Sequence, residues 1–302
     1  MSDAQPKAPE DWRNFSTRFP ISACRLKRDG LKFLYRILNE RQKEYRDRVL
    51  SREPQHPNET EQDFKQRKAS AYNAFVVSVT ISAENGEMLT GNKEEIFDDV
   101  NFPARLRSVF YSTQSVPSAV LNHVPQDRAM LFLDFSRPPM FDFSRLPTLP
   151  TPNDSNFEIS AVSETWFSAT KAKLVDFFNE RRSGYEWLHR AGIYDVLLFV
   201  IGLPMAVWAC ARLQGMVPMI ANLDTIPKGL VYCYTFLAVL LIFRTVFSYS
   251  RWVFPKIEIE NDARGSPLRH RAVWAVVMGG IFLPALYDVI KALADSVLHL
   301  SQ

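Results

Sequence analysis

The stretch FVVSVTISAENGEMLT, residues 75–90, predicts a β-hairpin. Every second residue from Phe75 to Ile81 is apolar, which is the period of a strand that buries one face. Asn85 and Gly86 follow directly, and this pair tolerates the positive φ angles of a tight hairpin turn. Residues 87–90 then form the returning strand, so the fold is built outward from an antiparallel sheet.

The segments on either side of this hairpin complete an α+β domain. Strands are predicted at 105–113, 129–135 and 156–162, and helices at 25–52, 61–71 and 163–182. Helices followed by a run of strands and a closing helix are typical of an α+β fold. The sequence therefore predicts a soluble domain at 24–190, with a mostly antiparallel sheet of about five strands flanked by helices. Residues 1–23 are predicted to be a polar N-terminal arm.

Composition excludes several classes of protein. The chain has 302 residues, of which 47% are hydrophobic and 23% charged, so it is not a disordered protein. A formal net charge of +3 lacks the basic excess of a dedicated nucleic-acid binder, and nucleic acid is not indicated as a partner. Cys24, Cys210 and Cys233 stand apart from one another, so the sequence indicates neither a disulfide framework nor a metal site. No cofactor motif is present.

The C-terminal third is predicted to be a membrane domain, residues 191–302. It contains three apolar runs, which extend with their flanks to spans at about 193–212, 229–249 and 272–290. Each approaches the roughly 20 residues that a helix needs to cross a bilayer core of about 30 Å. The alternative is a set of buried helices in a large soluble domain, but the last third of the chain has too few polar residues to cover them.

The distribution of basic residues predicts the orientation of these spans. The first connection holds only Arg212 and Lys228, whereas the second holds five basic residues: Arg251, Lys256, Arg264, Arg269 and Arg271. By the positive-inside rule, the N-terminal domain and the second connection lie in the cytosol. Three spans then place the C-terminus on the opposite side, across the inner membrane if the protein is bacterial. The end of the third segment could instead lie along the interface.

Charged residues near the cytosolic ends of the spans are candidate functional residues. Asp195 lies in the first span and Arg244 in the second, so the two side chains could form an intramembrane pair. The alternative is that Arg244 reaches the headgroups and that Asp195 is already in water. Arg181, Arg182 and Arg190 precede the first span and are predicted to contact anionic lipid.

The sequence Asp-Phe-Ser-Arg occurs twice, at 134–137 and 142–145, on a proline-rich connection after the apolar strand at 129–135. Loops beyond strand ends often bind ligands, so Asp134, Arg137, Asp142 and Arg145 are candidate contacts for a ligand or partner. The alternative is local structure, in which Asp and Ser bond the nearby backbone. Catalysis by the two carboxylates is disfavoured, because an extended connection would hold them more than about 20 Å apart. No catalytic residues are predicted, since the sequence lacks the familiar hydrolase, zinc-protease and nucleotide-binding motifs.

These observations predict a membrane-anchored sensor or effector. Its cytosolic domain would bind a ligand or protein that the sequence does not identify, and would couple to three membrane helices in an oligomer. The lipid bilayer and a second copy of the chain are the other expected partners. Two alternatives remain open: a membrane-tethered enzyme that acts on a lipid headgroup or a nucleotide, and a structural subunit of a larger membrane complex.

Overall fold

The computed structural model describes residues 13–122, 124–140, 145–260, 267–284, 286–288 and 290–291. Its contacts divide the chain into two units. Unit 1 comprises Met1–Ser136, Asn153–Ser183 and Ile257–Ala263, and unit 2 comprises Arg137–Pro152, Gly184–Lys256 and Arg264–Gln302. A single boundary at about residue 190 therefore does not separate the two units. The chain passes between the units after Ser136, Pro152, Ser183 and Lys256.

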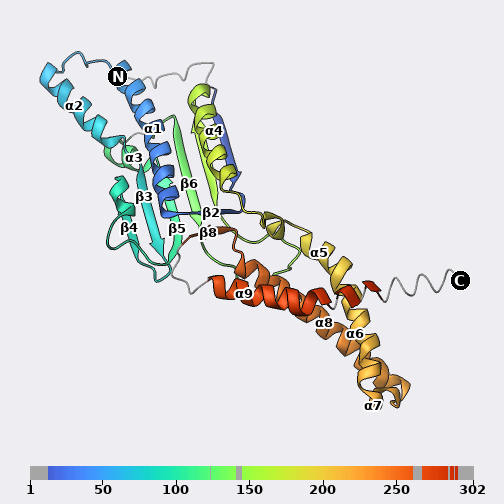
Figure 1. Ribbon diagram of the computed structural model, residues 1–302. Coiled ribbons are helices and arrows are strands. Elements are labelled where there is room, and N and C mark those ends of the chain that lie inside the picture. The colour runs from blue at the N-terminus through green and yellow to red at the C-terminus, as the bar shows by residue number, and fades with distance from the viewer. Residues whose placement is uncertain are drawn as a thin grey trace. The chain divides into compact units, whose positions relative to one another are not determined.

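Unit 1 contains a six-stranded antiparallel sheet in the order β1-β7-β6-β5-β3-β4 (Figure 1). Its strands are β1 (Phe15–Pro20), β3 (Ser78–Ala83), β4 (Met88–Gly91), β5 (Leu106–Ser112), β6 (Arg128–Asp134) and β7 (Asn156–Ala161). Five of these six strands coincide with the strands that the sequence predicts. The α+β class and the antiparallel sheet are thus confirmed.

β1 corrects the prediction of a polar arm at residues 1–23. This strand pairs antiparallel with β7, from Phe15 opposite Ala161 to Pro20 opposite Asn156. Its half-buried residues alternate with exposed ones, and the ring of Phe19 lies 5.1 Å from that of Phe157. The polar composition of the segment concealed this period. Residues 1–12 of the predicted arm lie outside the described residues.

The predicted hairpin joins β3 to β4. Gly86 has a φ of +89°, a conformation that costs glycine little and other residues more. The Asn85 side chain accepts a hydrogen bond from the backbone N–H of Glu87 at 3.1 Å, which closes the turn. Ser82 pairs with Met88 across the hairpin.

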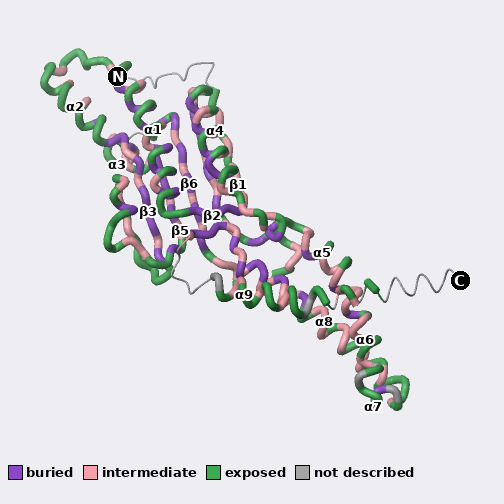
Figure 2. The backbone as a smooth tube through the Cα atoms, in the orientation of Figure 1, coloured by how far each residue is buried: buried purple, intermediate pink, exposed green. Residues whose placement is uncertain are grey.

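Helices cover one face of this sheet (Figure 1). α1 (Arg28–Arg52) and α4 (Glu164–Glu180) lie side by side, and the indole N–H of Trp166 donates to the carbonyl of Arg41 at 2.9 Å. Every second strand residue faces them, so the strands alternate between buried and half-buried positions in Figure 2. The other helices of unit 1 that the structure describes are α2 (Glu61–Ala74), α3 (Ser115–Leu121) and the 3-10 helix η1 (Glu94–Phe97).

A second, two-stranded sheet in unit 1 joins distant parts of the sequence. β2 (Cys24–Leu26) pairs in parallel with β8 (Ile257–Ile259), which comes after the second long apolar helix. Arg25 and Glu258 form an ion pair at 3.3 Å across this sheet, and the side chain of Glu258 is 5% exposed. Such short strands carry little periodic signal, and their pairing was not predicted.

Unit 2 contains two helices long and apolar enough to cross a membrane. The first, Ile193–Leu213, runs through α5 (Ile193–Leu197), the π-helix η3 (Leu198–Gly202) and most of α6 (Leu203–Met216). The second, Thr225–Val253, is α8. The rings of Tyr194 and Phe247 lie 5.2 Å apart where these two helices pack together. The short helices η2 (Glu186–His189) and α7 (Pro218–Ala221) complete this part of the unit.

The prediction of three membrane helices is corrected to two. The third apolar segment forms α9 (Pro267–Val277), an 11-residue helix, followed by the π-helix η4 (Met278–Phe282). Among the described residues, only Ile193–Leu213 and Thr225–Val253 reach the length and hydropathy of a span. The first half of α9 contains the polar residues Arg269, His270 and Arg271, which shorten its apolar part.

Candidate functional site

The connection between β6 and β7 belongs to unit 2 from Arg137 to Pro152. We call its described C-terminal part, residues 145–152, the proline-rich segment. Within unit 2 this segment is hydrogen-bonded to the C-terminal part of α8 and to residues at the start of the first apolar helix.

Arg251, near the end of α8, holds the proline-rich segment through backbone carbonyls. Its Nη1 donates to the carbonyls of Pro147 at 3.1 Å and Leu149 at 3.0 Å. Its Nε donates to the carbonyl of Leu188 at 3.1 Å, and its Nη2 to that of Arg190 at 3.5 Å. One guanidinium group therefore joins three pieces of chain: α8, the proline-rich segment and the turn around η2.

The chemistry of these partners is complementary. Proline has no backbone N–H, so a proline-rich segment presents carbonyl acceptors with few donors, whereas a guanidinium group has five donors and no acceptor. Arg251 is only 7% exposed, and its guanidinium carbon lies 4.6 Å from the ring centre of Phe247. No carboxylate pairs with it within the part of the chain that the structure describes. Its positive charge is thus balanced by carbonyl dipoles and an aromatic face rather than by an acid.

Thr151 and His189 form a second connection. The backbone N–H of Thr151 donates to the carbonyl of His189 at 3.2 Å, and the His189 Nδ1 lies 2.9 Å from the Thr151 hydroxyl oxygen. His189 is 5% exposed. Burial, and then the positive charges of Arg251 and Lys256, lower the pKa of His189 to about 4. The imidazole is therefore neutral at pH 7.

The structure places the predicted intramembrane residues, Asp195 and Arg244, on this same segment. Asp195 accepts a hydrogen bond from the Thr148 hydroxyl at 2.7 Å, and Arg244 donates to the carbonyl of Arg145 at 3.0 Å. The backbone N–H of Gly192 also donates to the carbonyl of Thr148, at 2.9 Å. The Asp195 and Arg244 side chains thus both bind the proline-rich segment, and a pair between them stays a prediction.

The remaining residues of the Asp-Phe-Ser-Arg repeat are dispersed. The carboxylate of Asp134 accepts from the backbone N–H groups of Ser136 at 2.9 Å and Asp154 at 3.4 Å, as in a local turn. Arg137 belongs to unit 2, where its guanidinium carbon lies 5.1 Å from the ring centre of Trp252. Asp142 lies outside the described residues. Contact of these residues with a ligand stays a prediction.

The three predicted membrane-interface arginines are divided between the units. Arg181 and Arg182 belong to unit 1 and Arg190 belongs to unit 2. Arg181 donates to the carbonyl of Phe177 at 3.0 Å and forms an ion pair with Glu180 at 3.1 Å. Arg190 forms an ion pair with Glu186 at 3.6 Å, and its side chain is 63% exposed.

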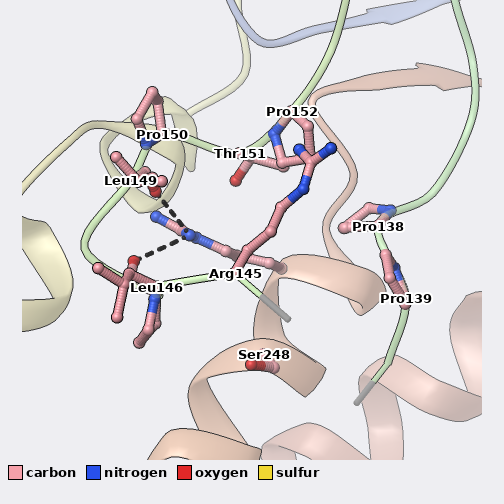
Figure 3. A pocket seen from close by; sticks show the side chains of 11 residues that line it. Pro138, Pro139, Arg145, Leu146, Leu149, Pro150, Thr151, Pro152 and Ser248 are labelled. Atoms are coloured by element: carbon pink, nitrogen blue, oxygen red, sulfur yellow. Dashed lines mark hydrogen bonds between the residues drawn. The ribbon is translucent and has the colours of Figure 1, made fainter. Parts of the chain in front are cut away.

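A cavity of about 290 Å³ opens beside the proline-rich segment (Figure 3). Its walls come mainly from prolines and leucines of the connection, together with Ser248 and Arg251 of α8. The Arg145 side chain extends along the cavity toward Thr151 and Pro152. Two of the described lining residues, Arg145 and Arg251, are basic, and none is acidic. The walls of the cavity are thus mainly apolar, with two arginine side chains among them.

Reasoning from sequence missed the central member of this site. Arg251 counted only as one of five basic residues that orient the spans. His189 and Thr151 received no role at all. No local pattern could have connected them, because Arg251 contacts carbonyls about 60 and 100 residues away in the sequence. The one signal available in the sequence was the position of Arg251 near the polar end of the second apolar helix.

The described residues include no group of three or more His, Cys, Asp or Glu side chains that could hold a metal ion. Comparison with protein-family models, with curated proteins and with solved structures finds no match.

Proposed function

We propose that this protein is a membrane-anchored sensor or effector, in which unit 1 recognises a ligand or protein and unit 2 anchors it and responds. The main support is the set of bonds that Arg251 makes. The proline-rich segment lies on the connection between β6 and β7, two central strands of the sheet, and within unit 2 it is hydrogen-bonded to both apolar helices. We therefore expect a displacement of this connection to move both helices.

The path of the chain supports the same proposal. Besides the proline-rich segment, α8 continues into β8, which is part of the small parallel sheet of unit 1. α4 in turn leads through η2 into the first apolar helix. A simple anchor needs one connection, which can be flexible. Several short connections, some of them hydrogen-bonded, favour a role in transmission.

We also propose that unit 1 lies in the cytosol. β2 precedes the two apolar helices and β8 follows them, yet the two strands pair in one sheet. The chain must then cross the membrane an even number of times between them, and two spans satisfy this condition. The basic residues after α8 favour the cytosolic side. Self-association of the anchor is part of the same proposal.

Fractionation tests the anchor. Membranes that contain the full chain are washed with alkaline carbonate and then extracted with detergent. We expect the protein to resist the wash and to enter detergent, because two apolar helices hold it in the bilayer. Release by the wash would refute the anchor.

Hydrogen exchange of the full chain in nanodiscs tests the sensing role. Cytosolic metabolites, nucleotides and proteins are screened for binding, and a ligand of unit 1 is expected to change amide protection in residues 145–152 and at the end of α8. Arg251→Met should abolish the change in α8 but not the binding itself. A ligand that alters the sheet and leaves α8 unchanged in the wild-type chain would show that unit 2 is only an anchor. A screen that finds no ligand would refute the sensing role.

A further inference from the structure

We propose that the outer edge of β1 binds an extended, acidic segment of a partner protein as an additional strand of the sheet. This inference rests on the recognition role proposed above for unit 1, and it names the place of recognition and the chemistry of the partner. All the residues on which it depends belong to unit 1.

The first argument is that β1 has backbone groups without a partner strand. β1 is the first strand in the order β1-β7-β6-β5-β3-β4, so only one of its edges is paired among the described residues. The Ile21 N–H donates to the carbonyl of Ser155 at 3.0 Å, and this pair continues the register of β1 with β7. Hydrogen-bonded pairs alternate along an antiparallel ladder, so the odd-numbered residues of β1 bond β7. The N–H and carbonyl groups of Ser16 and Arg18 therefore point away from the sheet, where a further strand can bond them.

The second argument is an apolar surface beside this edge, where β1 lies next to α4 (Figure 2). Phe15 and Phe19 are half-buried and alternate with exposed residues of β1. The ring centre of Phe15 lies 5.8 Å from that of Phe167 of α4, and Phe167 and Val175 are likewise only partly buried. An added strand would lie about 4.8 Å from β1, with every second side chain toward α4. Apolar residues at these alternate positions would cover the partly exposed phenylalanine rings.

The third argument is the charge around the edge. Arg13 and Arg18 are exposed, and the Lys171 ammonium lies 4.8 Å from the ring centre of Phe19. None of these three basic side chains has an ion pair among the described residues. Glu158, opposite Arg18, is the one acidic residue of β7 in register with β1, so the basic groups outnumber it. Opposite charges across a strand pair stabilise the pairing, so the remaining positions of the partner strand should be acidic.

The same charges argue against a second copy of the chain at this edge. β1 contains no acidic residue, so two β1 strands paired with each other would bring Arg13 and Arg18 of both copies together unneutralised. Basic residues and proline at a sheet edge are a common protection against such pairing, and Pro20 ends β1 without an N–H. The edge is therefore unfavourable for a second copy and favourable for an acidic strand of another protein.

Binding of model peptides to the full chain in nanodiscs of zwitterionic lipid tests the proposal. The probes are two fluorescently labelled octapeptides, one of alternating valine and glutamate and one of alternating valine and lysine, and anisotropy measures their affinities. We expect the glutamate peptide to bind at least about tenfold more tightly. Its binding should slow the hydrogen exchange of the Ser16 and Arg18 amides, which the free chain leaves open to water.

Two variants identify the edge itself. Ser16→Pro removes an outward N–H and keeps every bond to β7, so it should weaken the glutamate peptide at least about tenfold while thermal unfolding of unit 1 stays as in wild type. Ser16→Ala is the matched control, because it removes the same side chain and keeps the N–H, and it should bind like wild type. Arg18→Glu leaves the backbone intact and should remove the preference for the glutamate peptide over the lysine peptide.

Several results would overturn the proposal. Equal affinity for the two peptides, or binding of neither, would exclude an acidic partner strand. Equal binding by Ser16→Pro and wild type would show attraction to the surface rather than strand addition. A changed number of copies per nanodisc in Ser16→Pro would assign the edge to contacts between copies.

The proposed function is tested separately. A ligand that binds elsewhere on unit 1 and changes amide protection in α8 would keep the sensing role, even if the peptides do not bind. A glutamate peptide that protects Ser16 and Arg18 but leaves residues 145–152 and α8 unchanged would keep this site and count against the sensing role.

Discussion

Replacement of Arg251 by methionine tests the central contact of unit 2. Methionine is unbranched, shorter than arginine and without donors, so the substitution removes all four hydrogen bonds to carbonyls and keeps the packing of the aliphatic part of the side chain. The expected result is that the proline-rich segment detaches more often from α8 while the sheet of unit 1 stays folded.

The magnitude follows from the burial of each partner. Leu188 is buried, so loss of a charged donor to its carbonyl costs about 2 kcal/mol. Pro147 is half-buried and Leu149 is 52% exposed, so water can replace Arg251 there and each loss costs about 0.5 kcal/mol. Removal of a desolvated charge returns part of this energy. The net cost is about 2–3 kcal/mol, which corresponds to about a 30- to 150-fold increase in opening.

Amide hydrogen exchange measures this opening directly. The N–H groups of Thr151 and Gly192 are bonded across the contact at 3.2 and 2.9 Å, and they exchange only when the segment opens. Both should exchange about 30- to 150-fold faster in Arg251→Met. Arg190→Met, which removes an exposed side chain of the same type, should change them by less than about threefold. Unchanged exchange of Thr151 and Gly192 in Arg251→Met would refute the role of Arg251 in holding the segment.

Three further perturbations report on other parts of the chain. The pKa of His189 is lowered to about 4 in the folded protein, so unit 2 should lose up to about 3 kcal/mol of stability as the pH falls from 6.5 toward 4, and thermal unfolding of His189→Gln should not show this loss. Gly202→Ala should weaken the packing of the two apolar helices, because the added Cβ would lie 3.2 Å from Phe243; Gly215→Ala, where nothing lies within 4 Å, is the control, and equal detergent resistance of the two variants would contradict the contact. Thr60→Ala should cost about 1 kcal/mol in denaturant unfolding of unit 1, because the Thr60 hydroxyl caps α2; no change would mean that water replaces this cap.

Elements with a strong local period were predictable. The alternation in β3 and the turn at Gly86 each depend on residues a few positions apart, and the structure confirms them. The same is true of the two long apolar helices, since a run of about 20 apolar residues needs no partner to be recognised. β1 was not predicted as a strand, because its polar edge-strand composition conceals the alternation. The third apolar segment was wrongly predicted to be a membrane span, because a hydropathy run does not reveal where its helix begins.

Only the tertiary structure decided which distant residues meet. The strand order β1-β7-β6-β5-β3-β4 and the parallel pair β2-β8 depend on contacts between segments far apart, for which a single sequence carries no periodic signal. The same reason explains Arg251. Its residue type and its place near the end of α8 are plain in the sequence, but the carbonyls that it binds carry no side-chain signature, because every residue has one. A site built from backbone acceptors becomes visible only when the chain is folded.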